Sequence, residues 1–143
     1  MSNDEAITFL KKHLQSIREN DNKTYYETTG EDLTLYEWWI TPHLIDGLPF
    51  HEFMMGENEK LGTVFGAEGK AKSATRYDLS NLNIQNYGDT VIASYTLLTS
   101  TASTEGVKVS SHNESRVMVK QNDTWKVVHV HKSPAWQAPH NPA

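Results

Sequence analysis

Hydrophobic residues recur at helical spacing near the start of the chain and alternate along its second half. The first segment, Ser2 to Asn20, places four of them on one helix face, namely Ile7, Leu10, Leu14 and Ile17. Ser2 and Glu5 fit a capping box, in which a hydroxyl and a carboxylate satisfy free backbone amides. A short second helix carrying Tyr25 and Tyr26 is expected next, with Gly30 closing it.

The stretch from Leu33 to Trp39 alternates and is rich in strand formers, which predicts a strand with Leu33, Leu35 and Glu37 on one face and Thr34, Tyr36 and Trp38 on the other. Pro49 then occupies the first position of a third helix. Phe50, Phe53 and Met54 give this helix an apolar stripe. Residues 56–72 show no period and are expected to form a loop.

The second half has the composition of strands. The expected strands are Ser73–Leu79, Asp89–Ser100, Val107–Lys120 and Trp125–His131. The helices come first and an antiparallel sheet comes last, which is the α+β pattern of segregated elements. We expect three helices over one face of a twisted sheet, with a concave hollow between the helices and the sheet. We expect a single domain over residues 1–134 and an extended tail over residues 135–143.

Composition narrows the function. The 143 residues carry a net charge of −5 and no cysteine, which excludes disulfides and thiolate metal sites. Lysine and arginine are scattered, so nucleic-acid binding is not expected. The sequence contains no run of 18 apolar residues, so no membrane span is predicted. The acidic, polar beginning is unlike a secretory signal, so a cytoplasmic location is expected. We expect no cofactor.

The last expected strand carries alternating histidines. One face would hold Trp125, Val127, His129 and His131, and the other Lys126, Val128, Val130 and Lys132. Two histidines could bind a metal, but no third ligand is evident, so we expect no metal site. The histidine face is instead expected to pack against a second subunit, and the valine face to line the hollow with Lys132 near its mouth. Tyr36, Trp38 and Trp39, near His43, could form a pocket wall or an interface, with the two tryptophans on opposite faces.

Two segments resemble a known family. Leu44-Ile-Asp-Gly-Leu-Pro-Phe-His-Glu-Phe53 is similar to the motif around the first pocket histidine of the calcium/calmodulin-dependent protein kinase II association (hub) domain. Glu114-Ser-Arg-Val117, with Trp125-Lys-Val-Val-His-Val-His-Lys-Ser133, is similar to the final hairpin of that domain. This family lies within the SnoaL-like, nuclear-transport-factor-2-like superfamily. The resemblance spans roughly Glu5 to Pro134, and residues 56–72 are longer here than in the hub domain.

The resemblance implies a cone-shaped half-barrel that dimerises, with dimers assembling into rings. In the kinase the hub gathers catalytic domains and performs no phosphotransfer. The present sequence has no glycine-rich loop, no catalytic aspartate loop, no Asp-Phe-Gly motif and no basic helix of the calmodulin-target type. A kinase or calmodulin-binding label would therefore be inherited from the family name and not from these residues.

The resemblance also implies a cavity that favours a small anion such as a carboxylate. Tyr25, His51 and Arg116 match a tyrosine, a histidine and an arginine of that cavity, while Lys132 and Thr96 stand where two further arginines would be. Lysine lacks the planar fork of arginine, which weakens bidentate carboxylate binding.

Alternatives remain open for these residues. Arg116 could instead form a structural ion pair with Glu37 or Glu114, and His51 could be an ordinary core histidine. An enzyme of the SnoaL-like or ketosteroid-isomerase-like kind is the second function class, with Tyr25 as hydrogen-bond donor and His51 or Glu37 as base. A subunit of a larger complex is the third.

Overall fold

The computed structural model describes residues 1–60 and 75–135, which contain three helices and six strands. In chain order the elements are α1 (Asn3–Glu19), α2 (Asn22–Thr28), β1 (Thr29–Glu37), β2 (Thr41–Asp46), α3 (Leu48–Lys60), β3 (Thr75–Asn86), β4 (Thr90–Ser103), β5 (Gly106–Gln121) and β6 (Thr124–Pro134).

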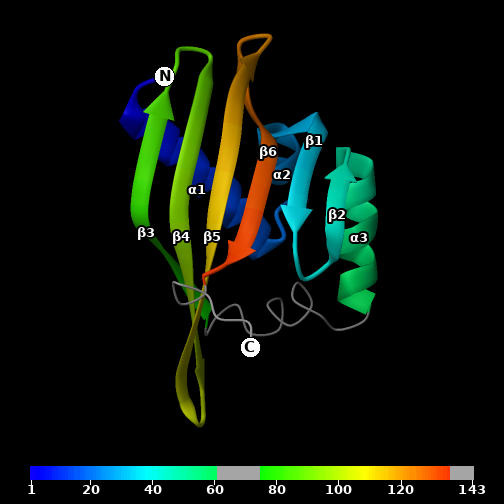
Figure 1. Cartoon of the computed structure of the whole chain (residues 1–143), viewed down its shortest axis with the longest axis vertical. Coiled ribbons are helices and arrows are strands. Elements are labelled where there is room, and N and C mark those ends of the chain that lie inside the picture. Colours follow the sequence, from blue (N-terminus) through cyan, green and yellow to red (C-terminus); the bar gives the residue numbers. More distant parts are fainter. Residues whose placement is uncertain (61–74, 136–143) are drawn as a thin grey trace, which may run out of the picture.

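The six strands form one curved, unclosed sheet in the order β2-β1-β6-β5-β4-β3. Neighbours are antiparallel except β1 and β6, which are parallel. The helix α1 lies behind the long strands, and β4 and β5 continue together as a hairpin beyond the body of the sheet (Figure 1). The expected α+β half-barrel, with helices on the concave side of a mostly antiparallel sheet, is confirmed.

The helix α1 begins where the sequence predicts. Ser2 Oγ accepts from the Glu5 amide at 3.1 Å, and Glu5 Oε1 accepts from the Ser2 amide at 3.2 Å, which completes the capping box. Asn20 ends the helix in the left-handed conformation, at φ 56°. Leu10 and Leu14 are buried against the sheet, so the apolar stripe of the sequence is the packed face.

The core fills the space between the helices and the inner face of the sheet. Across four strands, Leu35, Val130, Arg116 and Ala93 pair in one row, and each is at most 3% exposed. Their sequence neighbours therefore point to the outer face, because side chains alternate along a strand. The inward face of β1 is Leu33, Leu35 and Glu37, as predicted.

Two expectations about the first half were wrong. The strand β2 was missed, and it is a short edge strand that contains Pro42, a residue that edge strands tolerate. The helix α2 ends at Thr28, so Gly30 lies inside β1 instead of closing the helix. A Cβ on Gly30 would lie 3.0 Å from Val128 Cγ1, so a larger residue where β1 meets β6 would require Val128 to shift.

The third helix also departs from its prediction. It continues to Lys60, so the first residues of the expected 56–72 loop are helical, and residues 61–72 lie outside the described residues. Phe50 and Phe53 are 49% and 59% exposed, so the expected apolar stripe does not face the core. Leu48 and His51 are buried instead. None of the described helices has the length and apolar character to cross a membrane.

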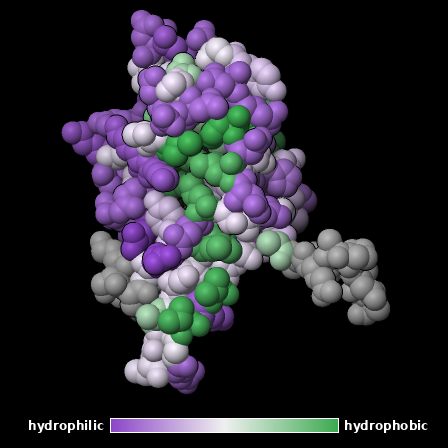
Figure 2. All heavy atoms as spheres, turned by 90° about the vertical axis from the view of Figure 1, so that its left-hand side faces the viewer, coloured by the Kyte–Doolittle hydropathy of each residue, from purple (hydrophilic) through white to green (hydrophobic). Residues whose placement is uncertain are grey.

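The strands are longer than predicted, and four of their five pairings contain a register shift. Residues 73–74 lie outside the described residues, and β3 continues beyond Leu79 to Asn86. A bulge around Asn81, at φ 56°, breaks the alternation there. Leu79, Leu82 and Ile84 still reach the core, and a band of apolar side chains is visible from the β3 side (Figure 2). The expected link 101–106 is mostly strand, and β6 includes Ser133 and Pro134. Residues 136–143 of the predicted tail lie outside the described residues.

Candidate functional site

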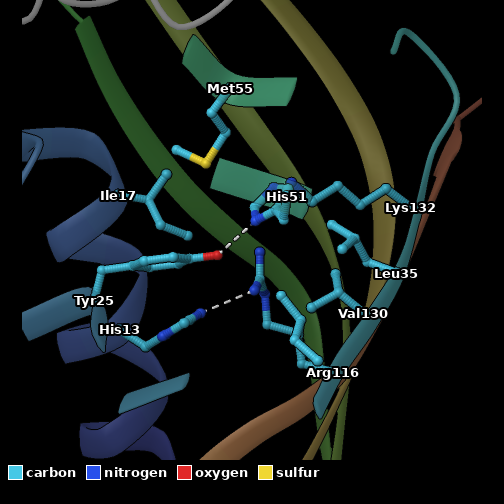
Figure 3. A pocket seen from close by; sticks show the side chains of 10 residues that line it. His13, Ile17, Tyr25, Leu35, His51, Met55, Arg116, Val130 and Lys132 are labelled. Atoms are coloured by element: carbon cyan, nitrogen blue, oxygen red, sulfur yellow. Dashed lines mark hydrogen bonds between the residues drawn. The ribbon is translucent and has the colours of Figure 1, made fainter. Parts of the chain in front are cut away.

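A small cavity lies between the helices and the inner face of the sheet. Its volume is about 10 Å³, roughly the space for one water molecule. The residues lining it are His13, Ile17, Tyr25, Leu33, Leu35, His51, Met55, Arg116, Val130 and Lys132. The structure thus brings together all four residues predicted for a binding site, Tyr25, His51, Arg116 and Lys132, from four different elements (Figure 3).

Three of these residues belong to a buried line of hydrogen bonds that is centred on Glu37. His51 Nδ1 lies 2.9 Å from the Tyr25 hydroxyl, and His51 Nε2 lies 2.7 Å from Glu37 Oε1. Lys132 Nζ donates to the other carboxylate oxygen, Glu37 Oε2, at 3.2 Å. Both oxygens of a carboxylate that is fully buried are therefore satisfied.

Electrostatics explains how this carboxylate stays charged. Burial alone would raise the pKa of Glu37, but the Lys132 ammonium and the hydrogen bond from His51 outweigh burial and lower the pKa to about 2. Burial raises the pKa of the Tyr25 hydroxyl well above its usual value, so this group stays protonated. When the His51 ring is neutral, the Tyr25 hydroxyl donates to His51 Nδ1, and His51 Nε2–H donates to Glu37.

A second buried network surrounds Arg116. Its Nε donates to the Tyr95 hydroxyl at 2.9 Å and to Glu114 Oε1 at 3.2 Å. Glu114 also accepts from the Tyr95 hydroxyl at 2.6 Å and contacts His112 Nε2 at 2.5 Å. The alternative that Arg116 pairs with Glu114 is confirmed. Burial would raise the pKa of Glu114, but the charge of Arg116 and the His112 hydrogen bond lower it strongly.

His13 completes this network from α1. Arg116 Nη1 lies 3.0 Å from His13 Nε2, and since a guanidinium only donates, Nε2 accepts. The proton of the ring therefore lies on Nδ1, which donates to Thr28 Oγ1 at 2.8 Å. Burial and then the charge of Arg116 hold the pKa of His13 well below its usual value, so the ring is neutral.

The sequence did not single out His13 or Tyr95. His13 follows Leu10 by three positions and so shares its helix face, which is the signal that points to burial. The resemblance put Thr96 where the family cavity has an arginine, but Tyr95 is the inward residue at this point of β4. Thr96 instead donates from Oγ1 to Asn113 Oδ1 at 2.7 Å and is absent from the residues that line the cavity.

The two faces of β6 differ from the prediction because of a bulge. Arg116 pairs with Val130 and Val117 with His129, but Met118 pairs with Val127, so Val128 is the extra residue. Val127 is fully buried and therefore faces the core together with Val130, whereas it was expected to share a face with His129. Lys132 does line the cavity, as expected.

The histidines of β6 make ordinary contacts on the outer face. His129 Nδ1 lies 2.8 Å from Thr34 Oγ1, and the ring of His131 lies 5.0 Å from that of Tyr36. Within residues 1–60 and 75–135, no group of three or more acidic, histidine or cysteine side chains is arranged to hold a metal ion.

The two tryptophans lie together in the turn after β1. Strand alternation was expected to separate them, but β1 ends at Glu37, and their rings meet edge to face at 4.6 Å. Both rings also contact the ring of His112. The Lys132 ammonium lies 4.9 Å from the Trp39 ring centre, so Trp39 covers this cation where it reaches Glu37.

Comparison with known proteins bears on the family and the fold of the chain. The family described as the calcium/calmodulin dependent protein kinase II association domain matches residues 2–136. The calcium/calmodulin-dependent protein kinase type II of Caenorhabditis elegans is 28% identical over 122 residues, or 84% of the present chain. The chain spans only 15% of the length of that kinase.

Solved structures give the same picture. The association domain of the C. elegans kinase superposes with a TM-score of 0.74 at 26% identity, covering 91% of this chain and 93% of that one. A nuclear transport factor 2-like superfamily protein of Salmonella enterica superposes with a TM-score of 0.68 at 19% identity, covering 98% and 95%. This second likeness concerns the fold alone.

Proposed function

The chain belongs to the calcium/calmodulin dependent protein kinase II association domain family, and from that premise we propose that it is a non-catalytic self-association domain whose cavity binds a small anion. The observation that carries self-association is the family match over residues 2–136 together with a fold that superposes on an association domain over nine tenths of both chains. A cytoplasmic location belongs to the same proposal, and microscopy of a fluorescently tagged chain tests it.

The outer face of the sheet supports self-association. Eight residues of the four strands β1, β6, β5 and β4 point outward in two adjacent rows, and we call them the outer-face patch: Thr34, Tyr36, Ile92, Ser94, Ser115, Val117, His129 and His131. None of the eight carries a fixed charge. A two-fold interface brings identical surfaces together, so a patch without like charges at its centre is suited to a second copy. Two sheets pack face to face in this way in many proteins.

Gel filtration with light scattering tests this part of the proposal. We expect the full chain to have at least twice the mass of a monomer and to keep that mass on dilution into the micromolar range. A chain that is a monomer at every concentration contradicts self-association, whatever its cavity binds.

Anion binding is supported by the composition of the cavity. Arg116 and Lys132 line it, so two cations border the space that an anion would occupy. Tyr25 and His51 line it as well, and both have polar atoms that can serve a ligand. Chemical-shift changes confined to these residues on addition of formate or chloride are the expected result.

One observation favours an isomerase-like enzyme as a second candidate. Tyr25, His51 and Glu37 form a continuous line of hydrogen bonds, and such a line can move a proton to or from a bound substrate. Against this, the cavity also contains Arg116 and Lys132, whereas a steroid-type site is mainly apolar. Turnover on enone or polyketide-like substrates that Tyr25→Phe abolishes would support the enzyme, and no turnover across a broad panel would reject it.

Kinase activity belongs to the longer relatives, and we do not assign it to this chain. The present sequence matches 15% of the length of the C. elegans kinase and contains none of the kinase motifs named above.

A further inference from the structure

We propose that the cavity takes up an anion close to water in size together with one proton, and that His51 accepts this proton while its hydrogen bond with Tyr25 reverses direction. The inference rests on the anion-binding part of the proposed function. It adds the size class of the ligand and the way in which pH regulates its binding.

The size follows from the free space. A cavity of about 10 Å³ accommodates about one water molecule, and protein interiors resist expansion because they are closely packed. A monatomic anion such as chloride can enter a space of this size with little movement of the lining side chains. A larger carboxylate would require lining side chains such as Met55 to move.

The need for a proton follows from the charges already present. The guanidinium of Arg116 lies beside the Glu114 carboxylate, and the ammonium of Lys132 lies beside the Glu37 carboxylate. Each buried cation therefore already has its counter-charge. An added anion would leave one uncompensated negative charge in a buried site, which is costly. Uptake of a proton by a neighbouring group removes this cost.

His51 can accept that proton without losing a hydrogen bond. In its neutral state, Nε2–H donates to Glu37 and Nδ1 accepts from the Tyr25 hydroxyl. In its charged state both ring nitrogens donate, so Nδ1–H donates to the Tyr25 oxygen over the same 2.9 Å contact. The hydroxyl proton of Tyr25 is then released from His51 and is able to donate to an anion in the cavity.

The other groups around His51 are unsuited to this role. Arg116 on β5 and Lys132 on β6 are already cationic, and Glu37 on β1 is held ionised by Lys132. His13 on α1 must keep Nε2 free to accept from Arg116. The neighbouring Glu52 of α3 is not among the lining residues, and Asp46 of β2, the strand beside α3, is exposed. Among the described residues that line the cavity, His51 is therefore the one that can accept a proton and still keep both of its hydrogen-bond partners.

The experiment is a chloride titration of the full-length protein labelled with ¹⁵N in its histidine rings, followed by nuclear magnetic resonance. Chloride is the probe because it cannot carry a proton into the site itself. We expect the apparent dissociation constant of chloride to rise with pH, by up to about tenfold for each pH unit, as coupling to one proton allows. At the same time the ring of His51 should change from a neutral tautomer to the imidazolium pattern.

Two variants locate the proton. His51→Gln keeps an N–H donor for Glu37 but cannot be protonated, so chloride binding should weaken and lose its pH dependence. His43→Gln, a change at an exposed position of β2 outside the cavity and the outer-face patch, should retain both the affinity and the pH dependence of the wild type. The ring signals of the wild-type protein answer the same question if His51→Gln folds poorly.

Each outcome decides a separate point. Chloride binding that is independent of pH, or a His51 ring that stays neutral when chloride is bound, overturns the proton uptake and leaves the anion site standing. Retained pH dependence in His51→Gln shows that another group takes the proton. Absence of any chloride or formate effect on the cavity residues rejects both the anion site and this inference, and leaves the self-association proposal to its own test.

Discussion

Glu37 is the residue on which the buried charges depend most. It lies at the end of β1, is fully buried, and meets His51 with one oxygen and Lys132 with the other. An isolated buried carboxylate would be strongly destabilising. Its two partners come from α3 and β6, so this single side chain connects β1 to the nearby helix α3 and to the last strand, 95 residues further along the chain.

The first prediction concerns Glu37→Gln. The change leaves the Lys132 ammonium, whose side chain is only 10% exposed, without its counter-charge. We expect the free energy of unfolding to fall by about 3 kcal/mol near neutral pH, in the range seen when one partner of a buried ion pair is removed. Urea unfolding followed by fluorescence measures it. Glu31→Gln, an exposed change on the same strand, should alter stability little.

The same pair of variants gives a pH dependence. Folding lowers the pKa of Glu37 from 4.5 to about 2, so the unfolded chain binds this proton more tightly than the folded protein. Its stabilising contribution is therefore complete above pH 4.5 and is lost as the pH falls toward about 2. The unfolding free energy of Glu37→Gln should fall less steeply over this range than that of Glu31→Gln. Equal slopes in the two variants would contradict the assignment.

At the residue scale, sequence reasoning found the four cavity side chains but not the network that holds them. Alternation along β1 placed Glu37 inward, and the family resemblance placed Tyr25, His51 and Arg116. Tyr95 was missed, since matching one family position to Thr96 ignored the alternation of β4, which buries every second residue from Val91 to Tyr95. Hydrogen-bond partners that are up to 103 residues apart, such as His13 and Arg116, follow only from the assembled sheet.

At the scale of elements, local patterns predicted the regular segments and failed at the irregular ones. The capped helix α1 and the core of each long strand follow directly from spacing. The bulge at Val128 shifts Val127 to the inner face, and no pattern in the sequence marks it. The short strand β2 carries Pro42 and lies at the sheet edge, where few contacts constrain composition. The exposed Phe50 and Phe53 of α3 show that an apolar stripe need not be a buried one.

Gly30 provides a test of how closely β1 and β6 approach. A Cβ at this position would lie 2.8 Å from Asp32 Oδ1 and 3.0 Å from Val128 Cγ1. Because Val128 is held in a bulge, we expect Gly30→Ala to destabilise the protein by about 1–3 kcal/mol, the usual cost of overpacking. Thermal unfolding by calorimetry measures the change.

Gly56 is the matched control for that substitution. It lies in α3, and a Cβ there would have no neighbour within 4 Å. Gly56→Ala should be neutral or stabilise the protein by up to about 1 kcal/mol, because alanine is the better helix former. If both alanine variants had the same stability, the close approach of β1 to β6 would not be what requires Gly30.

At the scale of the whole molecule, the sheet is covered by helices on its inner face while its outer face carries none of them (Figure 1). Segregated helices and strands in the sequence were enough to predict this arrangement. The strand order was not predictable in the same way, because the parallel contact of β1 with β6 pairs Thr34 with His129, 95 residues further along the chain. The outer-face patch at the centre of this uncovered face carries no fixed charge, so a second copy can pack there without opposing like charges.

The last prediction therefore tests the outer-face patch as the place where two copies meet. Val117 of β5 lies near the centre of the patch, where it pairs with Ile92 of β4 on one side and with His129 of β6 on the other. Val117→Lys would place two ammonium groups near each other across a two-fold interface, so we expect light scattering to report a monomer with an unchanged circular dichroism spectrum. Val107→Lys makes the same chemical change on the 69% exposed tip of the β4–β5 hairpin and should leave the assembly intact. Dissociation by Val107→Lys instead would move the interface from the sheet to the hairpin, because a lysine disrupts association only where it becomes buried against the partner.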